Sequence, residues 1–132
     1  MDIMPYMRKA NFYETDQMGI IHHSNYIRWF EEARIDFMEQ IGFGYIKAVN
    51  SGIDFAVLGV TCDYKSMTRF GDTVKIYANI TYMTEMKLTI TYKVIDTESR
   101  ELRATGETRH CPYHNERKRP VSLKKVLQSY MR

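Results

Sequence analysis

The fold is decided by residues 24–41, which read SNYIRWFEEARIDFMEQI. Apolar side chains recur there at steps of four, three, four and four, which is the spacing of one face of an α-helix. These side chains are Tyr26, Phe30, Ala33, Phe37 and Ile41. The polar side chains lie mostly away from this stripe, so the helix is expected to bury one face. Gly42 and Gly44 are expected to provide the left-handed stop that follows a helix.

Strands are expected on both sides of this helix. Residues 3–13 alternate irregularly and suggest a first strand, which is followed by a polar turn over residues 14–19. After the helix, residues 53–66 are typical of a strand. Its alternation slips by one residue near Leu58 and Gly59, as a β-bulge would cause.

The second half of the chain is dominated by alternating patterns. Residues 74–82 and 88–94 alternate strictly between apolar and polar side chains, and a long strand is expected over residues 101–114. A short amphipathic helix capped by Ser122 is expected to follow. Its apolar positions are Leu123, Val126, Leu127 and Tyr130. This order of elements predicts one α+β domain over residues 1–132, in which an antiparallel sheet buries the long helix.

Composition narrows the class of protein. With 132 residues, 44% of them hydrophobic, the chain is long enough to bury a core without disulfides or metals. A net charge of only +3 and the lack of a basic and aromatic motif argue against nucleic-acid binding. Neither a signal peptide nor a membrane span is visible, and Cys62 and Cys111 suit a reducing compartment, so a cytoplasmic location is expected.

Residues 11–34 concentrate the chemically useful side chains. Asp16 is expected on a loop and His23 at the opening of the helix, where free backbone N–H groups and the positive end of the helix dipole gather. A carbonyl laid across this end would be polarised, and an oxyanion would be stabilised. Asp16 would either attack the carbonyl or deprotonate a water, and the pattern leaves both routes open. The expected pocket wall is Met18, Ile20, Ile21 and Tyr26.

The same segment resembles the active-site signature of the 4-hydroxybenzoyl-CoA thioesterase-like branch of the hotdog superfamily. The matching positions are Tyr13, Glu14, Thr15, Asp16, Gly19, His23, Tyr26, Trp29, Glu31 or Glu32, Ala33 and Arg34. The similarity continues through Tyr64 and the turn at residues 70–72 to about Pro120. It implies the hotdog fold, with one long central helix wrapped by a curved antiparallel five-stranded sheet. The short C-terminal helix lies outside the resemblance.

The resemblance implies an acyl-CoA thioesterase without metal or prosthetic group, since coenzyme A is part of the substrate. Asp16 would be the catalytic carboxylate, and the backbone N–H of His23 would bind the carbonyl oxygen. The expected substrate-binding positions are Gly19, Ile21, His22, Tyr26 and Arg69. Among them, His22 stands where the branch often has Tyr or another side chain, and two roles stay open for it, a structural one and an influence on acyl specificity.

Partners follow from the same resemblance. Family members are homodimers, commonly paired again into tetramers, with CoA grooves at the subunit interface, so a homodimer and a dimer of dimers are expected here. Either CoA or acyl carrier protein could donate the acyl group, whose length and type the sequence leaves open. The CoA phosphates would be held by Arg69 or by the basic run at residues 117–119.

Other readings of the sequence are weaker. A hotdog hydratase or dehydratase also binds acyl-CoA, but those enzymes place their His within a different helix motif. A non-catalytic acyl-CoA-binding protein would not need a carboxylate beside a thioester. A metal site at His110, Cys111 and His114 is disfavoured, because neighbouring strand residues point to opposite faces and the two histidines would be roughly 13 Å apart.

Overall fold

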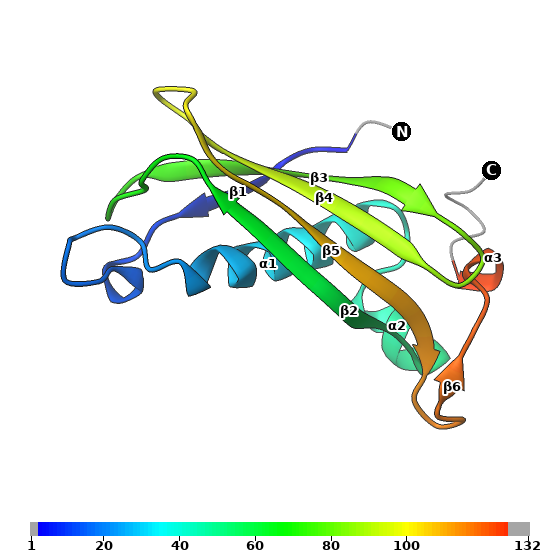
Figure 1. Cartoon of the computed structure of the whole chain (residues 1–132). Coiled ribbons are helices and arrows are strands. Elements are labelled where there is room, and N and C mark those ends of the chain that lie inside the picture. Colours follow the sequence, from blue (N-terminus) through cyan, green and yellow to red (C-terminus); the bar gives the residue numbers. More distant parts are fainter. Residues whose placement is uncertain (1–2, 127–132) are drawn as a thin grey trace.

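The three-dimensional structure is a computed structural model that describes residues 3–126 (Figure 1). The strands are β1 (Tyr6–Lys9), β2 (Ile53–Tyr64), β3 (Thr73–Met83), β4 (Leu88–Asp96), β5 (Leu102–His114) and β6 (Arg119–Pro120). The helices are α1 (Ser24–Gln40), α2 (Tyr45–Ser51) and α3 (Leu123–Val126), and a 3₁₀ turn covers Phe12–Glu14.

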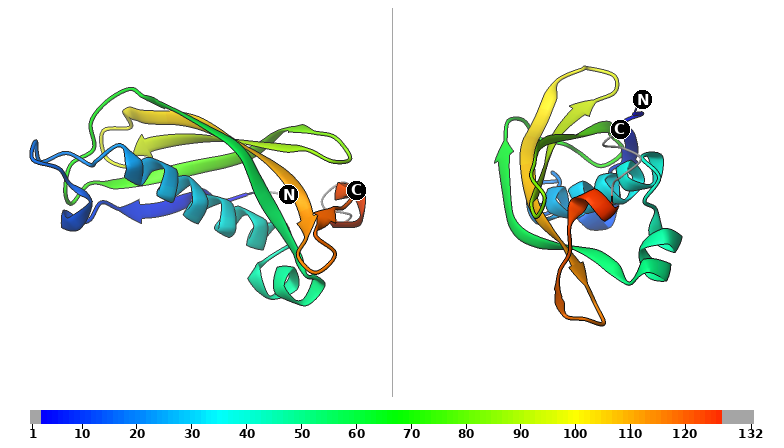
Figure 2. Two further views of the ribbon diagram at one scale, coloured as in Figure 1. Left: turned by 60° about the horizontal axis from the view of Figure 1, so that its bottom comes forward. Right: turned by 90° about the vertical axis from the view of Figure 1, so that its right-hand side faces the viewer.

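One antiparallel sheet curls around α1, as the two views of Figure 2 show. Its main strand order is β1-β3-β4-β5-β2, and the two-residue strand β6 pairs with the end of β5. The chain is therefore an α+β protein in which a curled sheet wraps a helix, as the expected hotdog fold requires. Within residues 3–126 the sheet has six strands where five were expected, because β6 was not predicted.

The predicted apolar stripe of α1 is buried in full. Tyr26, Phe30, Ala33 and Phe37 all face the sheet, and Ile41 is buried just beyond the helix end. Phe30 stacks on Tyr92 of β4 with ring centroids 4.5 Å apart. Gly106 of β5 lies against the same ring, and a Cβ at that position would run into Phe30 and into the backbone of β2. A glycine there lets the helix approach the sheet closely.

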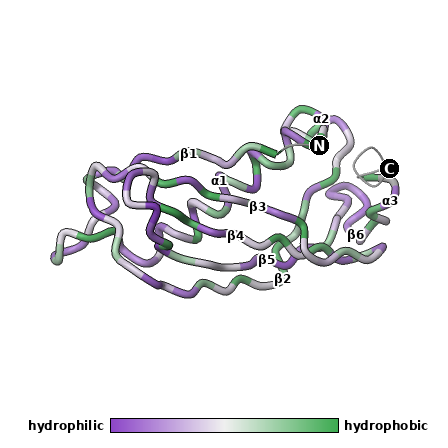
Figure 3. Tube along the Cα trace, turned by 90° about the horizontal axis from the view of Figure 1, so that it is seen from above, coloured by the Kyte–Doolittle hydropathy of each residue, from purple (hydrophilic) through white to green (hydrophobic). Residues whose placement is uncertain are grey.

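The strand predictions after the helix are confirmed to within a few residues. Buried and more exposed residues alternate over the first half of β3 and along most of β4. Figure 3 colours the trace by hydropathy, with hydrophilic and hydrophobic residues interspersed along the strands. The predicted slip in β2 is a real irregularity, because Val57 pairs with His110 while Gly59 pairs with the preceding residue, Arg109. The extra residue, Leu58, is the bulge.

The predicted first strand over residues 3–13 is too long at both ends. Only Tyr6–Lys9 form a strand, and the chain then turns at Phe12–Glu14. The Glu14 side chain accepts the Asn11 N–H at 2.9 Å, and the Asn11 carbonyl accepts the Glu14 N–H at 3.0 Å. The first bond is the Glu14 half of a capping box and the second is the backbone bond of a 3₁₀ turn, and together they close a turn where an extended chain was expected.

The segment between α1 and β2 differs from the expectation, whereas α3 agrees with it over the described residues. Gly42 is left-handed, with φ of 91°, but Gly44 is not, because it precedes the unpredicted helix α2 with φ of −77°. The large apolar side chains of α2, Tyr45, Ile46 and Val49, are exposed, so its sequence carries no buried stripe. In α3, the Ser122 hydroxyl accepts the Lys124 N–H at 3.2 Å, which confirms the cap. Leu123 and Val126 are buried, whereas Leu127 and Tyr130 lie outside the described residues.

Strand β2 is an edge strand of the sheet. It pairs with β5 along one edge, and within residues 3–126 its other edge pairs with no strand. Val57, Leu58 and Val60 expose apolar side chains on this strand. A long exposed edge of this kind is a template for pairing with another chain.

None of the helices described is both long and apolar enough to cross a membrane.

His110 of β5 is a buried titratable group, with 0% of its surface exposed. Its Nε2 lies 2.6 Å from the Thr108 hydroxyl, which is 2.7 Å from the hydroxyl of Tyr92. Its Nδ1 has no hydrogen-bond partner among the described residues. Burial, assisted by the positive charge of Arg34, lowers the pKa of His110 to about 4.

This histidine is expected to make stability depend on pH. An unfolded chain binds a proton at His110 near pH 6.5, whereas the folded protein does so only near pH 4. The unfolded state therefore holds more protons in this window, and the free energy of unfolding should fall by about 2 to 3 kcal/mol between pH 7 and pH 4.5. Urea denaturation of the wild type and of His110→Gln at both pH values measures this. An equal loss in both proteins would contradict the assignment.

Candidate active site

A cavity of about 280 Å³ opens at the N-terminal end of α1. One wall comes from the segment before and at the start of the helix, and the other comes from the end of β2 and the residues after it. The first wall consists of Asp16, Ile20, Ile21, His23 and Tyr26. The second consists of Tyr64, Lys65, Ser66 and Met67. The cavity therefore joins two segments about forty residues apart in the sequence.

Asp16 sits at the start of a small hairpin. Its N–H donates to the Ile20 carbonyl at 2.9 Å, and its own carbonyl accepts the N–H of Gly19 at 3.0 Å. Gly19 has φ of 75°, a left-handed conformation that suits glycine at this tight turn. One carboxylate oxygen of Asp16 accepts the N–H of Met18 at 2.8 Å. The hairpin thus fixes both the backbone and the carboxylate of Asp16.

The opening of α1 leaves a backbone donor available. The His22 N–H donates to the Glu14 carbonyl at 2.8 Å, and the Ser24 N–H donates to the His22 ring nitrogen Nδ1 at 3.2 Å. The N–H of His23, between them, donates to no acceptor within residues 3–126. An unpaired N–H at a helix N-terminus carries a partial positive charge and can bind an oxygen with partial negative charge.

Two tyrosines line the cavity beside this donor. The Tyr64 hydroxyl donates to the His23 carbonyl at 3.1 Å, and the Tyr26 hydroxyl donates to the Thr68 hydroxyl at 3.0 Å. Their rings pack edge to face, with centroids 5.3 Å apart. Burial raises the pKa of both phenols, that of Tyr64 to about 12. Both therefore stay protonated near neutral pH and act as hydrogen-bond donors rather than bases.

The structure places the predicted site residues in different settings. Asp16, Ile21, His23 and Tyr26 line the cavity together. Gly19 forms the turn beside the cavity. His22 is exposed, and its ring centroid lies 4.1 Å from that of His23. Arg69 is exposed and pairs through its backbone with Ile20, outside the wall. Met18, expected in the wall, is instead 68% exposed.

Sequence reasoning missed several residues of the site. Tyr64 matched the resemblance without a role, and nothing in the pattern placed Lys65, Ser66 and Met67 opposite Asp16. Glu14 also had no role, yet it is a buried carboxylate at the base of the hairpin. The capping spacing from Asn11 to Glu14 was a signal that could have located this turn. The residues described include no cluster of three or more His, Cys, Asp or Glu that could hold a metal.

Sequence comparison finds relatives along most of the chain. Residues 10–130 match the model of a family described as the thioesterase-like superfamily. The chain is 27% identical over 91 residues to the acyl-CoA thioester hydrolase YbgC of Escherichia coli O157:H7, a match that covers 69% of this chain and 68% of that protein.

Solved structures agree with this assignment. A hypothetical protein from Aquifex aeolicus is 36% identical, with a TM-score of 0.86, and the match covers 94% of this chain and 96% of that one. The DHNA-CoA thioesterase of Staphylococcus aureus is 27% identical, with a TM-score of 0.88, over 97% of this chain and 85% of that one. The chain therefore belongs to the thioesterase-like superfamily, and it is an enzyme of the thioester-hydrolase class.

Proposed function

We propose that this protein hydrolyses an acyl-CoA thioester to a free acid and CoA, with Asp16 and the backbone N–H of His23 as its catalytic groups. The observation that carries the proposal is their placement across one cavity at a helix N-terminus. A carboxylate supplies a base or nucleophile, and the free N–H supplies a donor for the carbonyl oxygen. Relatives that hydrolyse CoA thioesters support the substrate class.

The chemistry has two routes that this geometry serves equally. As a general base, Asp16 takes a proton from a water whose oxygen bonds to the carbonyl carbon. As a nucleophile, Asp16 itself bonds to that carbon, and water later cleaves the resulting anhydride. In both routes the carbon–sulfur bond breaks, and the CoA sulfur leaves with the electron pair and takes up a proton. The His23 N–H stabilises the oxyanion formed on the way. The reaction uses coenzyme A only as part of the substrate.

A homodimer is part of the proposal. The free edge of β2 is twelve residues long, and a second copy can pair with it about a two-fold axis. Antiparallel pairing would bring the start of the partner's β2 beside the end of β2 that borders the cavity. A dimer of dimers, acyl carrier protein as an alternative donor and a cytoplasmic location stay predictions.

This dimer also suggests where the CoA phosphates bind. The basic turn at residues 117–119 lies at the opposite end of the molecule from the Asp16 hairpin (Figure 1). It adjoins the start of β2, because Ile53 pairs with His114. The cavity adjoins the other end, about 35 Å away along the strand. Pairing of two β2 edges would move the partner's basic turn toward this cavity. Lys65 and Arg69 supply positive charge from the same protomer.

Substitution of the carboxylate tests the proposed function. Wild type and Asp16→Asn are compared on acyl-CoAs from acetyl to palmitoyl, with benzoyl-CoA included, by release of free thiol. Asp16→Asn should lower kcat by about 100-fold or more with little change in KM, because the amide is neither base nor nucleophile. Glu98→Gln, which removes a carboxylate from an exposed turn, should match the wild type. Binding of acyl-CoA without turnover by the wild type would instead support a non-catalytic binding protein.

Subunit mixing tests the placement of the basic turn. Arg117→Glu should raise KM and leave kcat nearly unchanged, because it weakens the attraction for phosphate. Asp16→Asn and Arg117→Glu subunits are then unfolded and refolded together. If a site takes Asp16 from one protomer and Arg117 from its partner, mixed dimers contain one intact site, and activity at low acyl-CoA concentration reappears. If both residues serve the same protomer's site, no intact site forms and this activity stays absent.

A further inference from the structure

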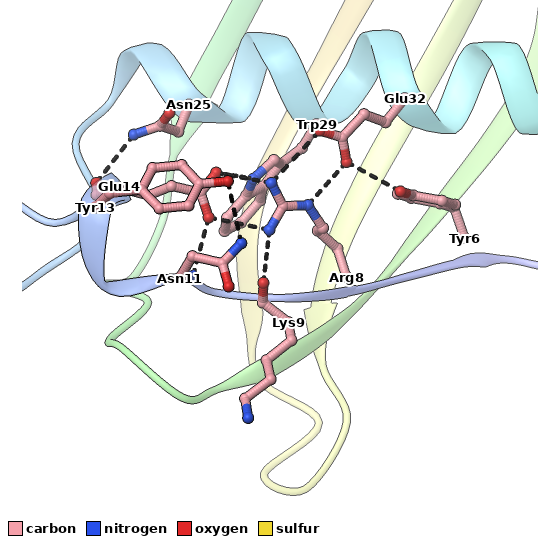
Figure 4. A network of polar contacts seen from close by, with 9 residues as sticks. All are labelled: Tyr6, Arg8, Lys9, Asn11, Tyr13, Glu14, Asn25, Trp29 and Glu32. Atoms are coloured by element: carbon pink, nitrogen blue, oxygen red, sulfur yellow. Dashed lines mark hydrogen bonds and ion pairs between the residues drawn. The ribbon is translucent and has the colours of Figure 1, made fainter.

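An ion-pair network links β1, the 3₁₀ turn and α1 just before the hairpin that carries Asp16 (Figure 4). Its centre is the carboxylate of Glu14, which is 3% exposed. Arg8 donates to both oxygens of this carboxylate, at 3.0 Å and 2.9 Å. The indole N–H of Trp29 and the backbone N–H of Asn11 donate to it as well, each at 2.9 Å. Four hydrogen bonds thus hold one carboxylate among β1, the 3₁₀ turn and α1.

Arg8 joins this carboxylate to a second one. Its Nε donates to Glu32 of α1 at 2.8 Å, and the Tyr6 hydroxyl donates to the same oxygen at 3.0 Å. Glu32 is more exposed than Glu14, and its side chain bonds to Arg8 and Tyr6 and to no residue of the Asp16 hairpin within residues 3–126. The two glutamates therefore share one arginine, but only Glu14 lies in the segment that leads into the hairpin.

The backbone of Glu14 fixes the opposite end of the hairpin. Its carbonyl oxygen accepts the N–H of His22 at 2.8 Å and the side-chain amide of Asn25 at 2.9 Å. The bond to His22 sets the orientation of that residue's backbone. The next peptide group along the chain carries the His23 N–H, which faces no acceptor among the described residues. The orientation of this donor therefore depends on where Glu14 is held.

We propose that Glu14 is a positioning residue, whose anchored carboxylate aims the His23 N–H and closes the hairpin that carries Asp16. It contacts neither cavity nor substrate and acts through its carbonyl bond to His22. The inference rests on the proposed function, because it assigns Glu14 to the same reaction. A small misplacement of catalytic groups reduces rates strongly, whereas it leaves binding of a large substrate nearly intact.

Glu14→Gln and Glu32→Gln form a matched pair for the test. Each removes one carboxylate charge from Arg8 and leaves it the other, so both variants should lose thermal stability. With the acyl-CoA that the wild type hydrolyses fastest, Glu14→Gln should lower kcat about 10- to 100-fold with KM unchanged within about three-fold. Glu32→Gln should keep kcat within about two-fold of the wild type. Equal losses of kcat in the two variants would overturn the inference.

Trp29→Phe covers the case in which Glu14→Gln does not fold. It keeps a buried aromatic ring and removes the N–H that donates to Glu14, together with the part of the indole that phenylalanine lacks. A several-fold fall in kcat with KM retained is expected, and kcat equal to that of the wild type would count against the proposal.

Amide hydrogen exchange adds a readout that is independent of turnover. Exchange at the His22 N–H should be at least about five-fold faster in Glu14→Gln or Trp29→Phe than in Glu32→Gln, because only the first two loosen the carbonyl that it binds. Equal exchange in all variants would overturn the positioning role. If the wild type hydrolysed no thioester at all, the proposed function would fail, while exchange would still decide whether Glu14 orders the hairpin.

Discussion

Burial of one face of α1 by a curled sheet is the constraint on which the rest of the structure depends. The stripe from Tyr26 to Phe37 can leave water only if strands cover it, and the absence of a side chain at Gly106 lets the ring of Phe30 lie close to them. A helix held in this way must begin at one end of the sheet. There its first turn meets the end of β2, and the cavity forms between them.

The chemistry of the cavity follows from this meeting of elements. A helix N-terminus supplies N–H groups that have no partner within the helix. Most of those here donate to the His22 carbonyl, the His22 ring or the Glu14 carbonyl. The His23 N–H donates to none of the described residues, and His23 and Asp16 line the same cavity. Tyr64 ties the same turn to the sheet through the His23 carbonyl. The acyl transfer that we propose needs a fixed donor and a fixed carboxylate, and neighbouring hydrogen bonds hold the His22 backbone and the Asp16 carboxylate.

What could be predicted from the sequence was local. The helical stripe, the alternating strands β3 and β4, and the bulge in β2 each appear as a period within a few residues, and Asp16 and His23 lie in one short motif. The remainder depends on contacts between distant segments. The pairing of β2 with β5 and the wrapping of the sheet bring Tyr64 to the helix end, and the turn at Glu14 forms because its side chain meets Arg8, Trp29 and the Asn11 backbone. Such contacts produce no periodic pattern in the sequence, so they could not be predicted from it.

The account depends most directly on the claim that the His23 N–H receives the carbonyl oxygen of the substrate. An acyl-CoA analogue in which a methylene group replaces the thioester sulfur is a ketone that cannot be hydrolysed. Its binding can be followed by NMR of ¹⁵N-labelled protein, with CoA alone as the reference. The account predicts a downfield shift of the His23 amide proton with the ketone that CoA alone does not produce. Binding of the ketone that shifts the amide of Tyr64 or Lys65 and leaves that of His23 unchanged would contradict it.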